Sequence, residues 1–121
     1  MTVPVRLRLS RAKGFDLQAV SRALNGLDAV NVARPTKWGN PFTVANSGGV
    51  HPALRYACEY ARYVDARPLR GKNLACWCGL EDQHGNYVPC HADVLLSLAN
   101  DVPMDEVIRE NTRRAKGETV R

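Results

Sequence analysis

Three cysteines in the second half of the chain have side chains that bind metals or act as nucleophiles. Cys76 and Cys78 flank Trp77, and Cys90 follows a polar stretch and stands directly before His91. Three thiolates and one imidazole are a ligand set that tetrahedral Zn²⁺ accepts. Against a zinc site, cysteines separated by one residue are a less usual pair of ligands than cysteines separated by two. Adjacent ligands such as Cys90 and His91 also chelate a metal awkwardly.

A second interpretation of the same residues needs no metal. Cys90 precedes a predicted helix, where free backbone amides and the helix dipole favour a thiolate. Cys90 would then be a nucleophile with His91 or His84 as its base, or the amides would bind a phosphate without any reaction. Asp93 falls in the first turn of this helix, where a carboxylate is favourable in any case. The catalytic candidates are thus Cys90, His91 and Asp93, and the third alternative is that the cysteines are only packed thiols.

The segment RPTKWGNPF, residues 34–42, is the candidate ligand-binding loop. Two prolines and a glycine restrain its backbone. Arg34 and Lys37 are suited to hold an anion, and Trp38 is suited to stack on a base or sugar. Asn40 is suited to hydrogen-bond a base edge or a ribose. The alternative is a structural loop, in which Trp38 fills the core and Asn40 bonds its own backbone.

Positive charge is concentrated near the start of the chain. The net charge is +5 over 121 residues, from 17 Lys+Arg against 12 Asp+Glu. Residues 1–47 contain seven basic and two acidic residues, which accounts for the whole surplus. Four of these basic residues belong to two loops, and they are the candidate anion-binding residues Arg11, Lys13, Arg34 and Lys37. A local anion site is favoured over a broad nucleic-acid surface, which stays as an alternative.

The hydrophobic pattern predicts the elements that must position these residues. It indicates strands at 5–9, 29–33 and 73–76, and helices at 17–25, 52–66, 91–99 and 104–116. In the first strand, Arg6 and Arg8 alternate with apolar residues, which predicts an edge or antiparallel strand with both arginines on its wet face. Cys58 is expected on the core side of the second helix.

Alternating strands and helices indicate an α/β fold, a small two-layer or three-layer domain with a short, largely parallel sheet and a C-terminal helix. We expect a single domain over residues 1–100 and a helical extension with a tail over 101–121. Right-handed crossovers place the loops after successive strands at one edge of the sheet, where ligands bind in open α/β folds. Those loops are 10–15, 34–49 and 77–89.

Three stretches of the sequence resemble a known family. The stretches VNVARPTKWGNPF, LRGKNLACWCGL and PCHADVLLSLAN resemble the bacterial and phage family catalogued as domain of unknown function 4326, over roughly residues 5–100. The resemblance implies two motifs, the first matched by Arg34, Pro35, Trp38, Gly39, Asn40, Pro41 and Phe42, and the second by Gly71, Lys72, Cys76, Trp77, Cys78, Cys90, His91, Asp93 and Leu96. It implies no activity. Many members have a shorter link between CWC and PCH. The longer link here, which contains His84 and Tyr87, predicts that this part of the rim tolerates insertions.

These residues favour a protein that binds a nucleotide or another phosphorylated small molecule at the loop edge. Transfer or hydrolysis of a nucleoside-type bond would accompany binding, although the sequence identifies no acid/base pair for it. The alternatives are a zinc-stabilised interaction module and a nucleic-acid-binding accessory protein. No apolar run approaches the roughly 18 residues that span a bilayer, so we expect no membrane partner and a cytoplasmic location, in the host if phage-encoded. Self-association through Met104, Val107 and Ile108 is a further alternative.

Overall fold

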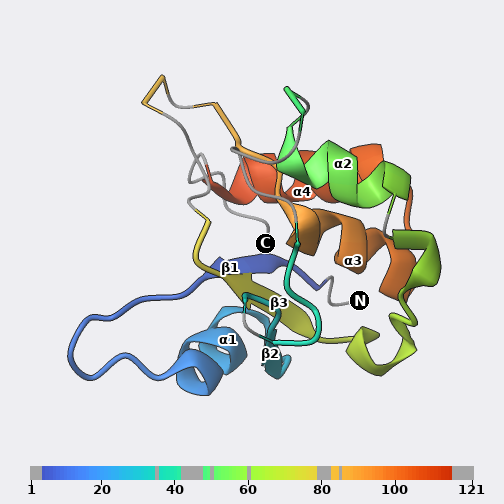
Figure 1. Cartoon of the computed structure of the whole chain (residues 1–121). Helices are drawn as coiled ribbons and strands as arrows, with labels where there is room; N and C mark the ends of the chain where they lie inside the picture. Colours follow the sequence, from blue (N-terminus) through green and yellow to red (C-terminus); the bar gives the residue numbers. More distant parts are fainter. Residues whose placement is uncertain are drawn as a thin grey trace.

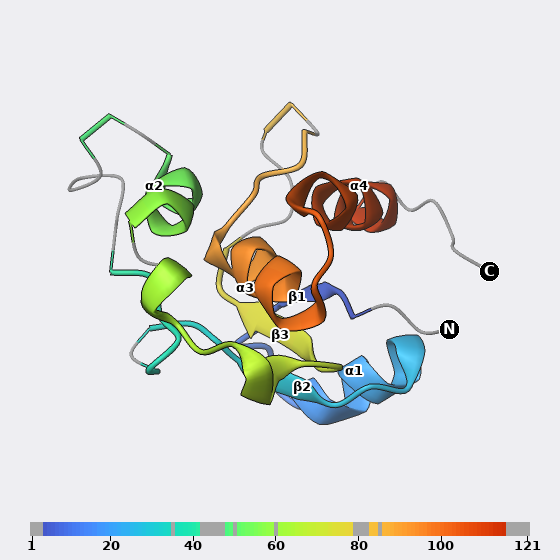
Figure 2. The same cartoon turned by 90° about the vertical axis from the view of Figure 1, so that its right-hand side faces the viewer.

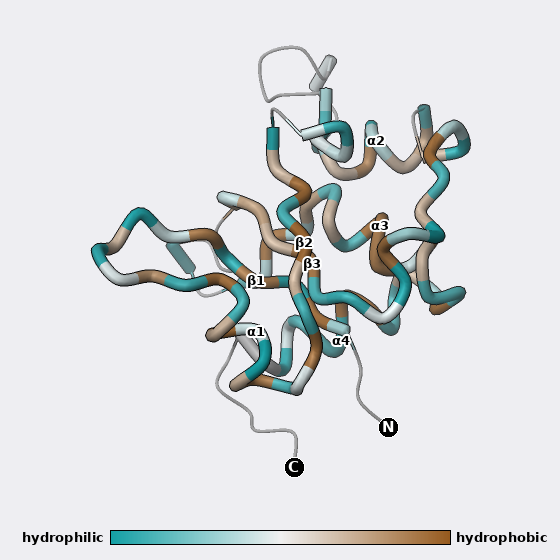
Figure 3. Tube along the Cα trace, turned by 90° about the horizontal axis from the view of Figure 1, so that it is seen from below, coloured by the Kyte–Doolittle hydropathy of each residue, from teal (hydrophilic) through white to brown (hydrophobic). Residues whose placement is uncertain are grey.

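A parallel sheet of three short strands lies at the centre of the computed structural model, which describes residues 4–34, 36–41, 48–49, 51–59, 61–78, 83–84 and 86–115. The strands are β1 (Arg6–Arg8), β2 (Ala29–Asn31) and β3 (Asn73–Cys76), in the order β1-β3-β2. Both neighbours run parallel to β3. Hydrophobic and hydrophilic positions both occur along these central strands (Figure 3). The predicted α/β class with a parallel sheet is confirmed, and β1 is an edge strand.

Four α-helices surround the sheet. They are α1 (Leu17–Asn25), α2 (Pro52–Glu59), α3 (His91–Asn100) and α4 (Met104–Ala115), and two 3₁₀ turns, η1 (Ala61–Tyr63) and η2 (Arg67–Leu69), follow α2. α1 covers one face of the sheet and α3 the other, while α2 and α4 flank the outer side of α3 (Figures 1 and 2). None of the described helices is long and apolar enough to cross a membrane.

The ends of α1 follow the sequence, but its inward face does not. Asp16 caps the helix by accepting from the Ala19 N–H, and Gly26 ends it in the left-handed conformation at φ 79°. Val20 and Leu24, two apolar residues of this helix, are 44% and 45% exposed. The inward position is taken by a serine, Ser21, whose hydroxyl accepts a hydrogen bond from the buried Asn73 side chain of β3. A polar contact with the sheet therefore sets the rotation of α1.

The helix expected over 52–66 is shorter, and the expected core position of Cys58 is wrong. α2 ends at Glu59, and Cys58 is exposed. The inward side of α2 carries Ala53 and Tyr56, both buried, and the Tyr56 ring packs against the ring of His91 with 5.5 Å between centroids. The large tyrosine fixes which side of the helix faces the core, and this turns Cys58 outward.

Arg6 is fully buried, which corrects the expectation that it faces solvent. Its Nη1 donates to Asp93 Oδ2 at 3.0 Å and to the Val88 carbonyl at 2.9 Å. Its guanidinium also lies 4.9 Å from the centroid of the Tyr87 ring. Arg8, the next arginine on β1, is exposed as expected. Burial of Arg6 is sustained because a carboxylate and a carbonyl replace the water that it loses.

Asp93 joins this ion pair to three other parts of the fold. The Cys90 N–H donates to its Oδ2 at 2.8 Å, and the Tyr87 hydroxyl donates to its Oδ1. Asn111 of α4 lies 3.5 Å from Oδ1 and accepts the Arg6 backbone N–H at 2.9 Å, so α4 covers the free edge of β1. Burial raises the pKa of Asp93, while the Arg6 charge and these hydrogen bonds oppose that rise.

We predict that removal of one member of the buried pair strongly destabilises the fold. Asp93→Ala leaves the Arg6 guanidinium buried without a counter-charge, which should lower the free energy of unfolding by about 3–5 kcal/mol in urea denaturation. The control is Asp28→Ala, which removes the partner of Arg22 in an ion pair whose side chains are 61% and 48% exposed. That variant should unfold almost as the parent does. Similar small shifts in both variants would contradict the prediction.

Candidate site at the carboxyl edge of the sheet

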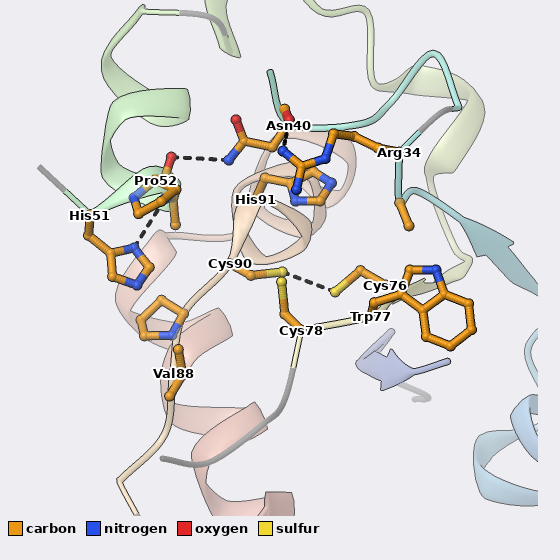
Figure 4. Close-up of a pocket in the computed structure, with 13 residues that line it drawn as sticks. Arg34, Asn40, His51, Pro52, Cys76, Trp77, Cys78, Val88, Cys90 and His91 are labelled. Atoms are coloured by element: carbon orange, nitrogen blue, oxygen red, sulfur yellow. Dashed lines mark hydrogen bonds between the residues drawn. The ribbon is translucent and has the colours of Figure 1, made fainter. Parts of the chain in front are cut away.

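A cavity of about 520 Å³ lies where β2 and β3 end and α3 begins (Figure 4). Residues from the loops after β2 and β3 line it together with the first residues of α2 and α3. The loop after β1 reaches the same edge, because the Arg11 guanidinium lies 5.1 Å from the centroid of the Trp77 ring. The expected meeting of the three loops at one edge is therefore found in the fold.

Three cysteines converge on the wall of this cavity. The Sγ atoms of Cys76, Cys78 and Cys90 all lie within 4.8 Å of one another, and those of Cys76 and Cys90 are 3.2 Å apart (Figure 4). Cys76 ends β3, and Cys78 lies two residues further along the chain. Cys90 is the N-cap of α3, where its Sγ accepts from the Ala92 N–H at 3.3 Å. These three sulfurs can hold a metal ion.

His91 lines the cavity but is not part of the three-sulfur group. Its Nε2 lies 2.7 Å from the Val32 carbonyl oxygen. Because a carbonyl only accepts hydrogen bonds, Nε2 carries the proton and cannot bind a metal in this arrangement. Burial lowers the pKa of His91, which favours the neutral ring. Of the four metal-ligand candidates, the structure brings together Cys76, Cys78 and Cys90.

The three thiols differ in pKa, and therefore in which of them loses its proton first. Hydrogen bonds from the Cys76 and Cys90 thiols lower the pKa of Cys78. Donation toward Cys78 raises the pKa of Cys76, and hydrogen bonding to both neighbours, together with burial, raises that of Cys90. Cys78 is the exposed member, whereas Cys76 and Cys90 are buried. The thiolate therefore forms first on the sulfur nearest to solvent.

Arg34 supplies the cationic group of the cavity wall. Its Nη1 donates to the Asn40 carbonyl at 3.0 Å, and the Asn40 Nδ2 donates to the Pro52 carbonyl at 3.1 Å. The loop also needs a glycine at position 39, because a Cβ there would lie 2.8 Å from Arg34 Cγ. Arg34 and Asn40 both line the cavity, and their bonds join the loop after β2 to the start of α2 (Figure 4).

The other predicted ligand-binding residues lie away from the cavity lining. Trp38 is 9% exposed and belongs to the hydrophobic core, as the structural alternative proposed, while the Lys37 ammonium lies 4.8 Å from its ring centroid. Arg11 stacks on Trp77, and Lys13 is exposed on the loop after β1. Pro35 and Phe42 of the first motif lie outside the described residues.

Asp93, the third catalytic candidate, points to Arg6 beneath the site and does not line the cavity. The sequence assigns no ligand role to Trp77 and His51, although both line the cavity. Trp77 is 45% exposed at the cavity, and its position between two candidate cysteines was the available signal. His51 also lines the cavity, and its Nδ1 accepts from the Ala53 N–H at 3.1 Å. Its place before Pro52 predicted only the start of a helix.

Comparison with protein-family models gives a match over most of the chain. The model of the family described as Domain of unknown function (DUF4326) matches residues 18–101. The chain belongs to this family. The DUF4326 match contains β2, β3 and α3, and every residue that lines the cavity, whereas β1 and α4 lie outside it. No curated protein and no solved structure matches the chain.

We predict an order of thiol reactivity in the metal-free DUF4326 protein. Iodoacetamide should alkylate Cys78 well before the buried Cys76 and Cys90, as peptide mass spectrometry would show. Since the pKa of Cys78 is lowered, its thiolate persists as the pH falls, and its rate should change little between pH 8 and 6. An ordinary thiol slows about tenfold per pH unit in that range. Faster labelling of Cys90 would contradict the arrangement.

Proposed function

We propose that this DUF4326 protein binds a nucleotide or another phosphorylated small molecule in the cavity. The observation that carries the proposal is the guanidinium of Arg34 in the lining of a 520 Å³ cavity at the carboxyl edge of a parallel sheet. Open α/β sheets bind ligands at this edge, and cavities of about 300–1,000 Å³ accommodate ligands of nucleotide size.

Arg34 suits an anionic group because its planar fork can bond two oxygens at once. One of its nitrogens is engaged with the Asn40 carbonyl, which orients the guanidinium and leaves further N–H donors for a phosphate. Trp77 takes the stacking role that the sequence suggested for Trp38, because it is the tryptophan that lines the cavity. Arg11 packs on its ring and holds the indole in place.

The proposal ends at binding and includes no reaction. Among the residues that the structure describes, no carboxylate lines the cavity. Asp93, the nearest candidate from sequence, is held by Arg6, Tyr87 and the Cys90 amide. Transfer or hydrolysis of a nucleoside bond would need an acid and a base that these residues do not provide.

A second candidate function is zinc binding, which the three convergent sulfurs favour. Thiolates select Zn²⁺ over the hard divalent cations, and three Cys ligands are common in its sites. The sulfur positions are set by the fold before any metal binds, since β3 places Cys76 and the cap of α3 places Cys90. Binding would stabilise the carboxyl edge by tying the loop after β3 to α3.

We predict that nucleotide binding depends on Arg34. Isothermal titration with AMP, ADP, ribose 5-phosphate and pyrophosphate should identify at least one ligand, and Arg34→Ala should weaken its affinity by about 10- to 100-fold, the value of a charge-assisted hydrogen bond. Arg70→Ala is the matched control, because Arg70 is an exposed arginine outside the cavity lining. Equal losses in both variants, or no binding to any of the four compounds, would refute the proposal.

We predict one zinc ion per chain in protein purified under reducing conditions with zinc supplied. Cys78→Ser and Cys90→Ser should each abolish stoichiometric zinc in elemental analysis, because two sulfurs bind the ion too weakly to survive purification. Cys58→Ser should retain it, since Cys58 is exposed and outside the three-sulfur group. Protein that contains no zinc, or equal loss from Cys58→Ser, would exclude the site.

A further inference from the structure

We propose that the metal held by Cys76, Cys78 and Cys90 keeps its fourth coordination position open to the cavity, and that the molecule bound by Arg34 fills it. The inference rests on both proposals above and goes beyond them, because it makes the anion subsite and the metal two ends of one site. The ligand class that fits is a phosphorylated molecule with a nitrogen donor in a ring, such as a purine nucleotide.

The number of donors is the first argument. Among the described residues, the metal-ligating group at this edge consists of three sulfurs. Tetrahedral zinc takes four ligands, and closed structural sites use four protein donors. The donor expected as the fourth, His91, is not part of this group. Three protein ligands with one remaining position is the pattern of zinc sites that bind exchangeable ligands.

The position of the sulfurs is the second argument. All three cysteines line the same cavity as Arg34, and their sulfurs converge there (Figure 4). On the other side of Cys76 and Cys90 lies packed protein, because both side chains are buried and belong to the hydrophobic core. A metal that contacts all three sulfurs therefore has the cavity, with Arg34 and His51 in its wall, as the space for a fourth ligand.

Charge is the third argument. Three thiolates around Zn²⁺ leave a net charge of −1, and this excess discourages a bare phosphate from reaching the metal. Arg34 provides the positive charge of the cavity lining, so the phosphate of a ligand is favoured there. The metal is then left to a neutral donor, and zinc accepts ring nitrogen as readily as it accepts histidine. A ligand with both groups satisfies the two ends of the site together.

The experiment uses the full chain with Co²⁺ in place of Zn²⁺, because the visible absorption of cobalt reports its ligands. Imidazole tests the nitrogen donor alone, and inorganic phosphate tests the anion alone. AMP carries both a ring nitrogen and a phosphate and tests the two together. We expect imidazole and AMP to shift the cobalt bands and AMP to displace imidazole, while phosphate alone leaves them unchanged. Arg34→Ala should weaken the AMP response at least tenfold and leave the imidazole response intact. Arg70→Ala should change neither.

The possible failures separate this inference from the proposals beneath it. Cobalt bands that stay unchanged with saturating imidazole and AMP would mean a closed metal site, which overturns the inference although metal binding stands. Binding of AMP in calorimetry without any spectral change would overturn it while nucleotide binding stands. A response to imidazole but not to AMP would overturn the assignment of one shared ligand. A chain that takes up no cobalt would overturn the metal proposal and the inference with it.

Discussion

The buried ion pair between Arg6 and Asp93 is the constraint on which the rest of the structure depends. Both side chains have an exposed fraction of 0%, so neither charge has water to replace its partner. Such a pair adds little net stability, but removal of one member leaves an uncompensated charge in the interior. The first strand, the segment before α3 and the last helix must therefore all be in place together, because Arg6, Val88 and Asn111 meet at this point.

The same ion pair determines where the candidate site forms. Asp93 occupies the third position of α3 and accepts the Cys90 N–H, which fixes the first residue of the helix. β1 also sets the other sulfur, because Arg8 pairs with Cys76 and the Leu9 N–H donates to the Cys76 carbonyl at 2.8 Å. The first strand is thus linked to two cysteines that are 14 positions apart in the chain, to Cys76 through the sheet and to Cys90 through the Arg6–Asp93 pair.

Sequence patterns predicted the order of strands and helices better than they predicted the side-chain contacts in the interior. The caps of α1, Asp16 and Gly26, and the apolar pattern of β3 depend on residues that are close together in the sequence. The parallel α/β order and the edge at which three loops meet could therefore be predicted from sequence. The burial of Arg6 could not be predicted, because an arginine that alternates with apolar residues in a strand is typical of a solvent-exposed face. The carboxylate that compensates its charge, Asp93, is 87 positions away in the sequence. Trp38 and Trp77 have the same side chain in two loops, and only tertiary packing decides which of them lies in the core.

The choice of cysteine at two positions argues that the edge does more than fold. The N-cap of a helix is filled best by serine, threonine, aspartate or asparagine, whose oxygen accepts a stronger hydrogen bond than sulfur does. Cys90 nevertheless caps α3 with its sulfur. Cys78 is exposed at the cavity and gains little from packing. Burial in the core accounts for Cys76 and contributes at Cys90, so the exposed Cys78 is the cysteine that packing does not explain, and it is the third sulfur that the proposed metal would use.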